Sequence, residues 1–141
     1  MLNSFPFTFL ESSVISHMRK LGTLIILCSF IFSQHFTVSL EETGESSLFI
    51  FEDSVSSLRP GDEIGLFDAN GIIDSEGNQG ELLVGAGVWT GSQIEVVAIH
   101  GIDLSQFGGP ILSGATEGNP LMLKVWKSIE EFECEVTYGI N

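Results

Sequence analysis

Apolar and polar residues alternate over most of the chain beyond residue 35, which is the pattern that β-strands produce. Successive side chains of a strand point to opposite faces of its sheet, so this period separates a buried face from a solvent face. Seven segments show the alternation or a short apolar run. They are residues 36–40, 48–51, 64–67, 82–89, 94–100, 121–126 and 132–138. We expect each of them to form a strand.

Two kinds of strand are predicted among these segments. Residues 36–40 and 132–138 alternate regularly, which predicts one buried face and one face in water. The run from Leu48 to Phe51 contains no polar residue and predicts a strand that is buried on both sides.

Glycine, proline and polar residues separate the predicted strands. Arg59–Asp62 contains Pro-Gly and predicts a tight turn, because proline presets φ and glycine relieves the bend that follows. Asp68–Gly80 is the most polar stretch and is predicted to be a long hairpin loop. Residues 101–120 are rich in glycine and contain no predicted strand. Short strands at this spacing, without a convincing helix, predict an all-β fold: an antiparallel β-sandwich, either Ig-like or jelly-roll-like.

The N-terminal segment has a different pattern. Arg19 and Lys20 precede an apolar run of about a dozen residues that ends near Gln34. A short basic region followed by such a run is typical of a secretory signal peptide, and the run is too short for a comfortable membrane span. The sequence therefore predicts a signal-peptide helix within 1–34 and one β-sandwich domain over 35–141. The alternative interpretation of the run is a buried strand or helix.

The signal also bears on the ends of the chain. A signal normally begins at its start Met, so we expect translation to start at Met18 and residues 1–17 to carry no function. Membrane contact is expected only through the signal before cleavage, and the location is expected to be secreted or at the cell surface. The chain stops soon after its last predicted strand, and both a true end and a truncated longer gene remain open.

The charge excludes one class of partner. After the predicted signal, three basic and 18 acidic residues remain, a formal net charge of −15. Such a field repels phosphate backbones, so nucleic acid is not expected as a partner. Cys134 is the single cysteine after the signal and is expected to be a small core residue, with an intermolecular disulfide as the alternative.

The acidic loop is the best candidate for metal binding. Asp68, Asn70, Asp74 and Glu76 place side-chain oxygens at alternate positions around a glycine, as calcium loops do. The spacing departs from the full EF-hand pattern, and a solvated loop is the alternative interpretation. Calcium is the one cofactor that the sequence suggests.

Two tryptophans are candidates for ligand binding. Exposed Trp89 and Trp126 would form a stacking platform for sugar, whereas a tryptophan within an apolar strand is more often part of the core. Solvent exposure of the two rings distinguishes these interpretations.

The sequence shows no catalytic set. No serine lies in a nucleophile-elbow pattern, and the histidines lack partners at zinc spacing. We therefore expect no enzyme activity. A small extracellular hydrolase remains an alternative, and it requires either a pocket that joins two carboxylates or a contact between His100 and a serine.

Three phrases in the chain are similar to those of a known family. They are Pro60–Asp68 (PGDEIGLFD), Leu83–Trp89 (LVGAGVW) and Gly118–Trp126 (GNPLMLKVW), in that order. Together they resemble a secreted β-sandwich module of bacterial extracellular proteins that often carry a type IX secretion C-terminal sorting domain. The resemblance implies a non-catalytic module that acts in adhesion or as a structural spacer, with an extracellular protein or polysaccharide as its partner. The sorting domain itself does not occur in this sequence.

Overall fold

The computed structural model describes residues 34–136 of the 141-residue chain. The chain divides into two units between Ser33 and Gln34. The predicted signal-peptide helix, Met18 and Tyr138 lie outside the described residues. Within 34–136, no helix is long and apolar enough to cross a membrane.

Eight strands and one short 3-10 helix form the described part, and every strand pair is antiparallel. The elements are β1 Ser46–Phe51, β2 Glu63–Ile72, β3 Gln79–Val88, β4 Ile94–Ile99, β5 Ile102–Asp103, η2 Ser105–Phe107, β6 Ile111–Leu112, β7 Leu121–Lys127 and β8 Phe132–Val136. The predicted all-β antiparallel sandwich is therefore confirmed.

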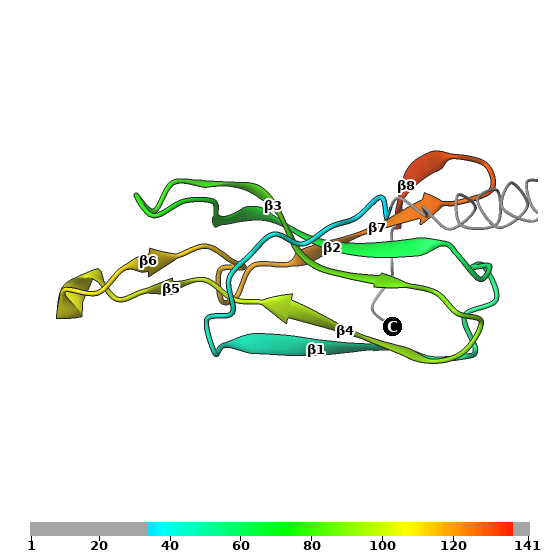
Figure 1. Ribbon diagram of the computed structural model, residues 1–141, viewed down its shortest axis with the longest axis horizontal. Helices are drawn as coiled ribbons and strands as arrows, with labels where there is room; N and C mark the ends of the chain where they lie inside the picture. Colours follow the sequence, from blue (N-terminus) through cyan, green and yellow to red (C-terminus); the bar gives the residue numbers. More distant parts are fainter. Residues whose placement is uncertain (1–33, 137–141) are drawn as a thin grey trace, which may run out of the picture. The chain divides into compact units, whose positions relative to one another are not determined.

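The strands form two layers, and a small hairpin projects from one end (Figure 1). One layer is a four-stranded sheet in the order β3-β2-β7-β8, and the other is the β1-β4 pair. The β5-β6 hairpin carries η2 at its tip. The central strand β2 bonds to β3 on one side and to β7 on the other.

The core lies between the two layers. Leu66 and Val84 from the larger sheet pack against Val96 and Ala98 of β4, and Ala115 completes this buried cluster. Apolar burial of this kind is the main favourable term in folding.

A short segment before β7 joins the two layers. Gly114 exchanges backbone hydrogen bonds with Ile72 at the end of β2, at 2.8 and 3.0 Å. The next residue, Ala115, bonds to Ile99 and Gly101 at the end of β4. A glycine-rich stretch that was predicted to lack strands thus contains β5, β6 and this link between the sheets.

The predicted strand over residues 36–40 is wrong in one respect. The segment is extended, and its apolar residues are more buried than the polar ones between them, but it pairs with no described strand. We call residues 35–45 the arm. Its start contacts the outer side of the larger sheet, and its end reaches β1 (Figure 1).

Two further predictions need correction. β1 is not buried on both sides, because its burial alternates and Leu48 and Ile50 are 56% and 54% exposed. The sheet that contains it has only two strands, β1 and β4. The loop predicted over Asp68–Gly80 is also shorter than expected, since β2 continues to Ile72 and β3 begins at Gln79.

Candidate functional site

The predicted calcium residue Asp68 is fully buried and has a different environment from the loop. Its carboxylate accepts hydrogen bonds from the backbone N–H groups of Asn70 and Thr116, at 2.9 and 2.8 Å. The side-chain amide of Asn119 donates to both oxygens, at 3.0 and 3.2 Å. The pairing of β2 with β3 is irregular between Asp68 and Gly71, and Asp68 joins β2 at this point to the segment before β7.

The other acidic side chains of the predicted site lie in the loop between β2 and β3. The Asp74 carboxylate accepts hydrogen bonds from Glu76 N–H, Asn78 N–H and the Asn78 side chain. These hydrogen bonds, led by that of the Asn78 side chain, lower the pKa of Asp74. The residues the structure describes contain no group of three or more His, Cys, Asp or Glu side chains placed to hold a metal ion. The structure thus does not bring Asp68, Asp74 and Glu76 together.

We accordingly expect millimolar calcium to leave the melting temperature unchanged. A site that binds only the native state must raise stability, so a titration followed by thermal unfolding reports on it directly. A rise that Asp74→Ala abolishes would restore the calcium interpretation of the loop.

A second buried carboxylate, Asp62, joins the turn before β2 to the end of β7. It accepts hydrogen bonds from Arg59 N–H at 3.0 Å, from Ser128 N–H at 3.1 Å and from the Lys127 ammonium at 2.9 Å. Burial by itself raises the pKa of Asp62, but these hydrogen bonds and the Lys127 charge outweigh it and hold the pKa below 3.8. The Gly-Asp-Glu phrase of the sequence is thus a structural junction.

The Asp62 junction predicts a specific response to acid. A lowered pKa means that its stabilisation is present above the ordinary value near 3.8 and is lost as the pH falls below it. We expect Asp62→Asn to lower the free energy of unfolding at pH 7 by about 2 kcal/mol, because Lys127 and two N–H groups lose a charged acceptor. The deficit should shrink in urea unfolding below about pH 4. An equal deficit at pH 7 and pH 3 would contradict this assignment.

The two predicted ligand-binding tryptophans have different surroundings. Trp89 is 2% exposed and belongs to the core, so it has no ring face for a sugar. Trp126 is partly exposed, but the His35 ring stacks on it with centroids 3.9 Å apart and planes 7° from parallel. One face of Trp126 is therefore occupied by the arm.

Glu63 fixes the start of the arm. Its two carboxylate oxygens accept the backbone N–H groups of His35 and Phe36, at 2.9 and 2.8 Å. Phe36 is buried and its ring meets Phe67 edge to face. Glu63 and the Trp126 stack thus attach the first residues after the predicted signal to the larger sheet.

His100 contacts a serine, which is one of the two features that would allow the hydrolase alternative. The Ser47 hydroxyl lies 2.8 Å from His100 Nε2, and the Thr43 hydroxyl donates to the His100 carbonyl at 2.7 Å. A hollow beside His100 also contains Glu45, Asp103 and Glu117, but Ser47 does not line it. The Ser47 side chain instead follows the inward face of β1. The contacts thus join the arm and β1 to the end of β4.

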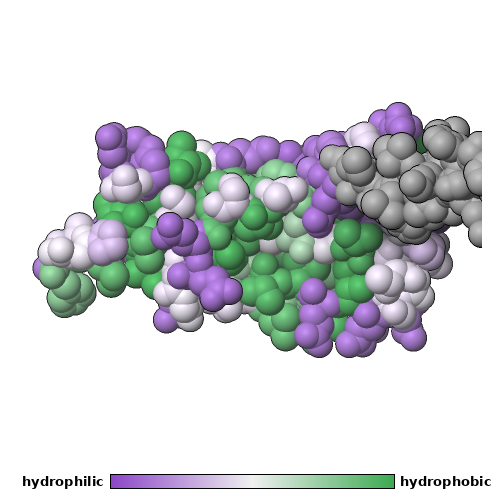
Figure 2. All heavy atoms as spheres, in the orientation of Figure 1, coloured by the Kyte–Doolittle hydropathy of each residue, from purple (hydrophilic) through white to green (hydrophobic). Residues whose placement is uncertain are grey.

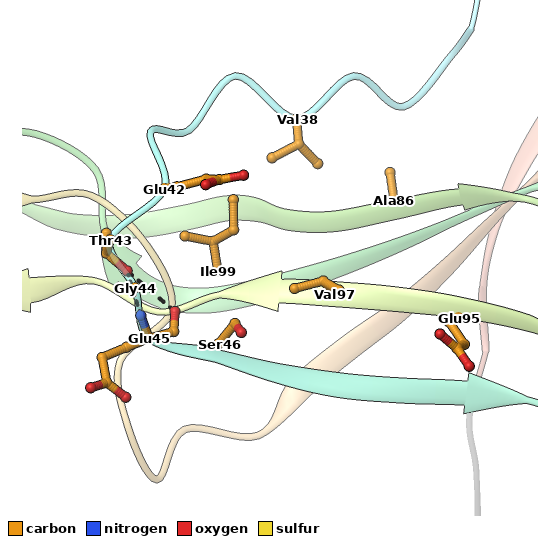
Figure 3. A pocket seen from close by; sticks show the side chains of 10 residues that line it. All are labelled: Val38, Glu42, Thr43, Gly44, Glu45, Ser46, Ala86, Glu95, Val97 and Ile99. Carbon is orange, nitrogen blue, oxygen red and sulfur yellow. Dashed lines mark hydrogen bonds between the residues drawn. The ribbon is translucent and has the colours of Figure 1, made fainter.

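An open groove runs between the arm, β3 and β4 (Figure 3). Val38 from the arm, Ala86 from β3 and Val97 and Ile99 from β4 supply its apolar surface. The carboxylates of the groove come from Glu42, Glu45 and Glu95. The groove continues onto the outer face of the β1-β4 pair, because Val97 lies directly opposite Leu48.

Sequence reasoning did not identify this surface. The apolar run Leu48–Phe51 is visible in the sequence, and an apolar strand in a two-stranded sheet can leave one face uncovered. The run does not show that its sheet has only two strands, so the exposed face could not be predicted from it. No protein-family model matches the chain, and comparisons with curated proteins and with solved structures also give no match.

Proposed function

We propose that this protein is a secreted or cell-surface β-sandwich module, without enzyme activity, that acts in adhesion or as a structural spacer. The observation that carries the proposal is that the buried acidic side chains have structural roles, whereas the exposed side chains of one sheet are apolar. The three buried carboxylates, Asp62, Glu63 and Asp68, are all bound to backbone N–H groups, whereas large apolar side chains lie outside on the β1-β4 pair. Carboxylates that are bound to the backbone are not free to act as acids or bases, and exposed apolar side chains favour contact with another macromolecule.

The predicted signal and the three phrases shared with secreted bacterial modules support the extracellular part of the proposal. The direct test is fractionation of cells that express the whole chain, next to cells that express it without residues 18–34. We expect the whole chain outside the cytoplasm and the shortened chain inside. Equal cytoplasmic retention of both would overturn the proposed location.

The non-catalytic part has its own test. Among the described residues, Ser47 and His100 are the pair that most resembles an activated serine, so they are the target of this test. If the protein has no hydrolase activity, a fluorophosphonate probe should leave it unlabelled. Ser47→Ala should cost about 1 kcal/mol of stability through the lost hydrogen bond. Labelling that Ser47→Ala removes would establish the hydrolase alternative instead.

A further inference from the structure

The outer face of the β1-β4 pair is an apolar surface on a molecule with a strongly acidic sequence. Leu48, Ile50 and Val97 are 56%, 54% and 50% exposed, and the register places Leu48 opposite Val97. Figure 2 shows hydrophobic side chains gathered over these strands, with hydrophilic groups at the border. Contiguous exposed apolar side chains with a polar rim are typical of interaction sites.

The edge of β1 is open and unprotected. β1 pairs with β4 and with no other described strand, and its register has no bulge. The sequence Ser46–Phe51 contains no charged residue and no proline, which are among the devices that usually prevent strand addition at an edge. By contrast, β8, which is an edge strand of the larger sheet, has two charged residues within the strand, Glu133 and Glu135.

The charges at this face have one sign. Glu45 precedes β1, Glu52 and Asp53 follow it, and Glu95 lies opposite Ile50. The three lysine and arginine residues in the described part of the chain form ion pairs away from this face. The pairs are Arg59 with Glu130, Lys124 with Glu81 and Glu133, and Lys127 with Asp62. An incoming strand therefore meets carboxylates that no described cation neutralises.

The same charges disfavour a second copy of this chain. In a symmetric antiparallel pair of β1 strands centred on Phe49, Glu45 of one copy would lie opposite Asp53 of the other, and like charges across strands destabilise pairing. A partner with positive side chains gains from the same field.

From these observations we propose that the β1 edge and the outer β1-β4 face form the docking site for an extended protein segment in which apolar residues alternate with Lys or Arg. The segment adds as a strand beside β1, so that backbone hydrogen bonds supply affinity and the alternate side chains supply specificity. Its apolar side chains continue the face formed by Leu48, Ile50 and Val97, and its cations, which point to the other face, are attracted by the carboxylates that flank β1 at Glu45, Glu52 and Asp53. The proposal rests on the proposed role as a contact module.

The probe for this site is an eight-residue peptide that alternates Val and Lys, blocked at both ends, added to the ¹⁵N-labelled full chain. We expect amide shifts to concentrate in β1 and β4, and the dissociation constant to rise at least tenfold between 50 mM and 500 mM salt. A matched peptide with Glu in place of Lys should bind at least tenfold more weakly. Equal binding of both peptides, or shifts concentrated at β8, would overturn the proposal.

Two variants complete the experiment. Ile50→Lys adds a charge to an exposed position of the edge and should weaken binding of the Val-Lys peptide at least tenfold, with an unchanged melting curve to show that the fold persists. Phe107→Lys is the control, because Phe107 is 87% exposed but lies on the β5-β6 hairpin. It should bind like the wild type, and weakening by both variants alike would count against the site.

Two further outcomes are separable. A concentration-dependent dimer that Ile50→Lys abolishes would show that a second copy occupies the edge, contrary to the proposal. Loss of peptide binding in a chain that is still exported overturns the docking site alone, whereas cytoplasmic retention overturns the extracellular role.

Discussion

Replacing Gly114 by alanine is expected to destabilise the protein by about 3 kcal/mol or more, the largest effect of any single methyl group we identify. A Cβ at this position would lie against the backbone of His100 and Gly101, with Gly101 N and the His100 carbonyl carbon as its nearest atoms. Backbone atoms in a hydrogen-bonded junction cannot move aside as a flexible side chain can. The methyl group therefore separates the segment before β7 from the end of β4.

The measurement is urea unfolding of Gly114→Ala beside Gly80→Ala. A Cβ at Gly80 would meet only Ile73 side-chain atoms at 3.6 Å, which is ordinary contact, so this control should remain close to the wild type. If Gly114→Ala lost less than 1 kcal/mol, the segment would not be the close junction between layers that we describe.

Replacing Asp68 by alanine is expected to cost about 3 kcal/mol. The change leaves the N–H groups of Asn70 and Thr116 and the Asn119 amide without the fully buried carboxylate that accepts their hydrogen bonds. Asp68→Asn should be intermediate, because its amide nitrogen replaces one acceptor with a donor.

Asp74→Ala is the matched control for Asp68. Asp74 also accepts three hydrogen bonds from N–H groups, but these lie in an exposed loop, where water replaces the carboxylate. Thermal unfolding of the variants should rank Asp68→Ala as much less stable than Asp74→Ala. Equal losses would mean that burial does not determine the role of Asp68.

The sequence predicted the strands well because period two is a local property. β2 and β7 include the segments expected of them, and β3 and β4 cover theirs except for Trp89 and His100 at the ends. It failed at residues 36–40, where the alternation is correct but the backbone has no partner among the described strands. An alternating pattern reports which side chains are buried, and it does not say whether another strand lies alongside.

The site residues were harder to predict because their roles depend on contacts distant in sequence. Asp68 resembled a metal ligand until Thr116 and Asn119, 48 and 51 residues away, were seen to donate to it. Ser47 and His100 are 53 residues apart, and no spacing rule connects them. The apolar run of β1 predicts a strand buried on both sides, because such runs are typical of sheets that are covered on both faces.

The arm has a consequence for the order in which the molecule opens. It pairs with no strand within residues 34–136, and the Glu63 carboxylate holds its start across 27 and 28 residues of chain. Release of its contacts at both ends, with Glu63 and Trp126 and with the His100 carbonyl, frees the arm while both sheets keep their ladders, so the arm is expected to detach before global unfolding and to dock last during refolding. In hydrogen exchange, the arm amides should then be replaced sooner than those of β2, with His35 and Phe36 the slowest within the arm.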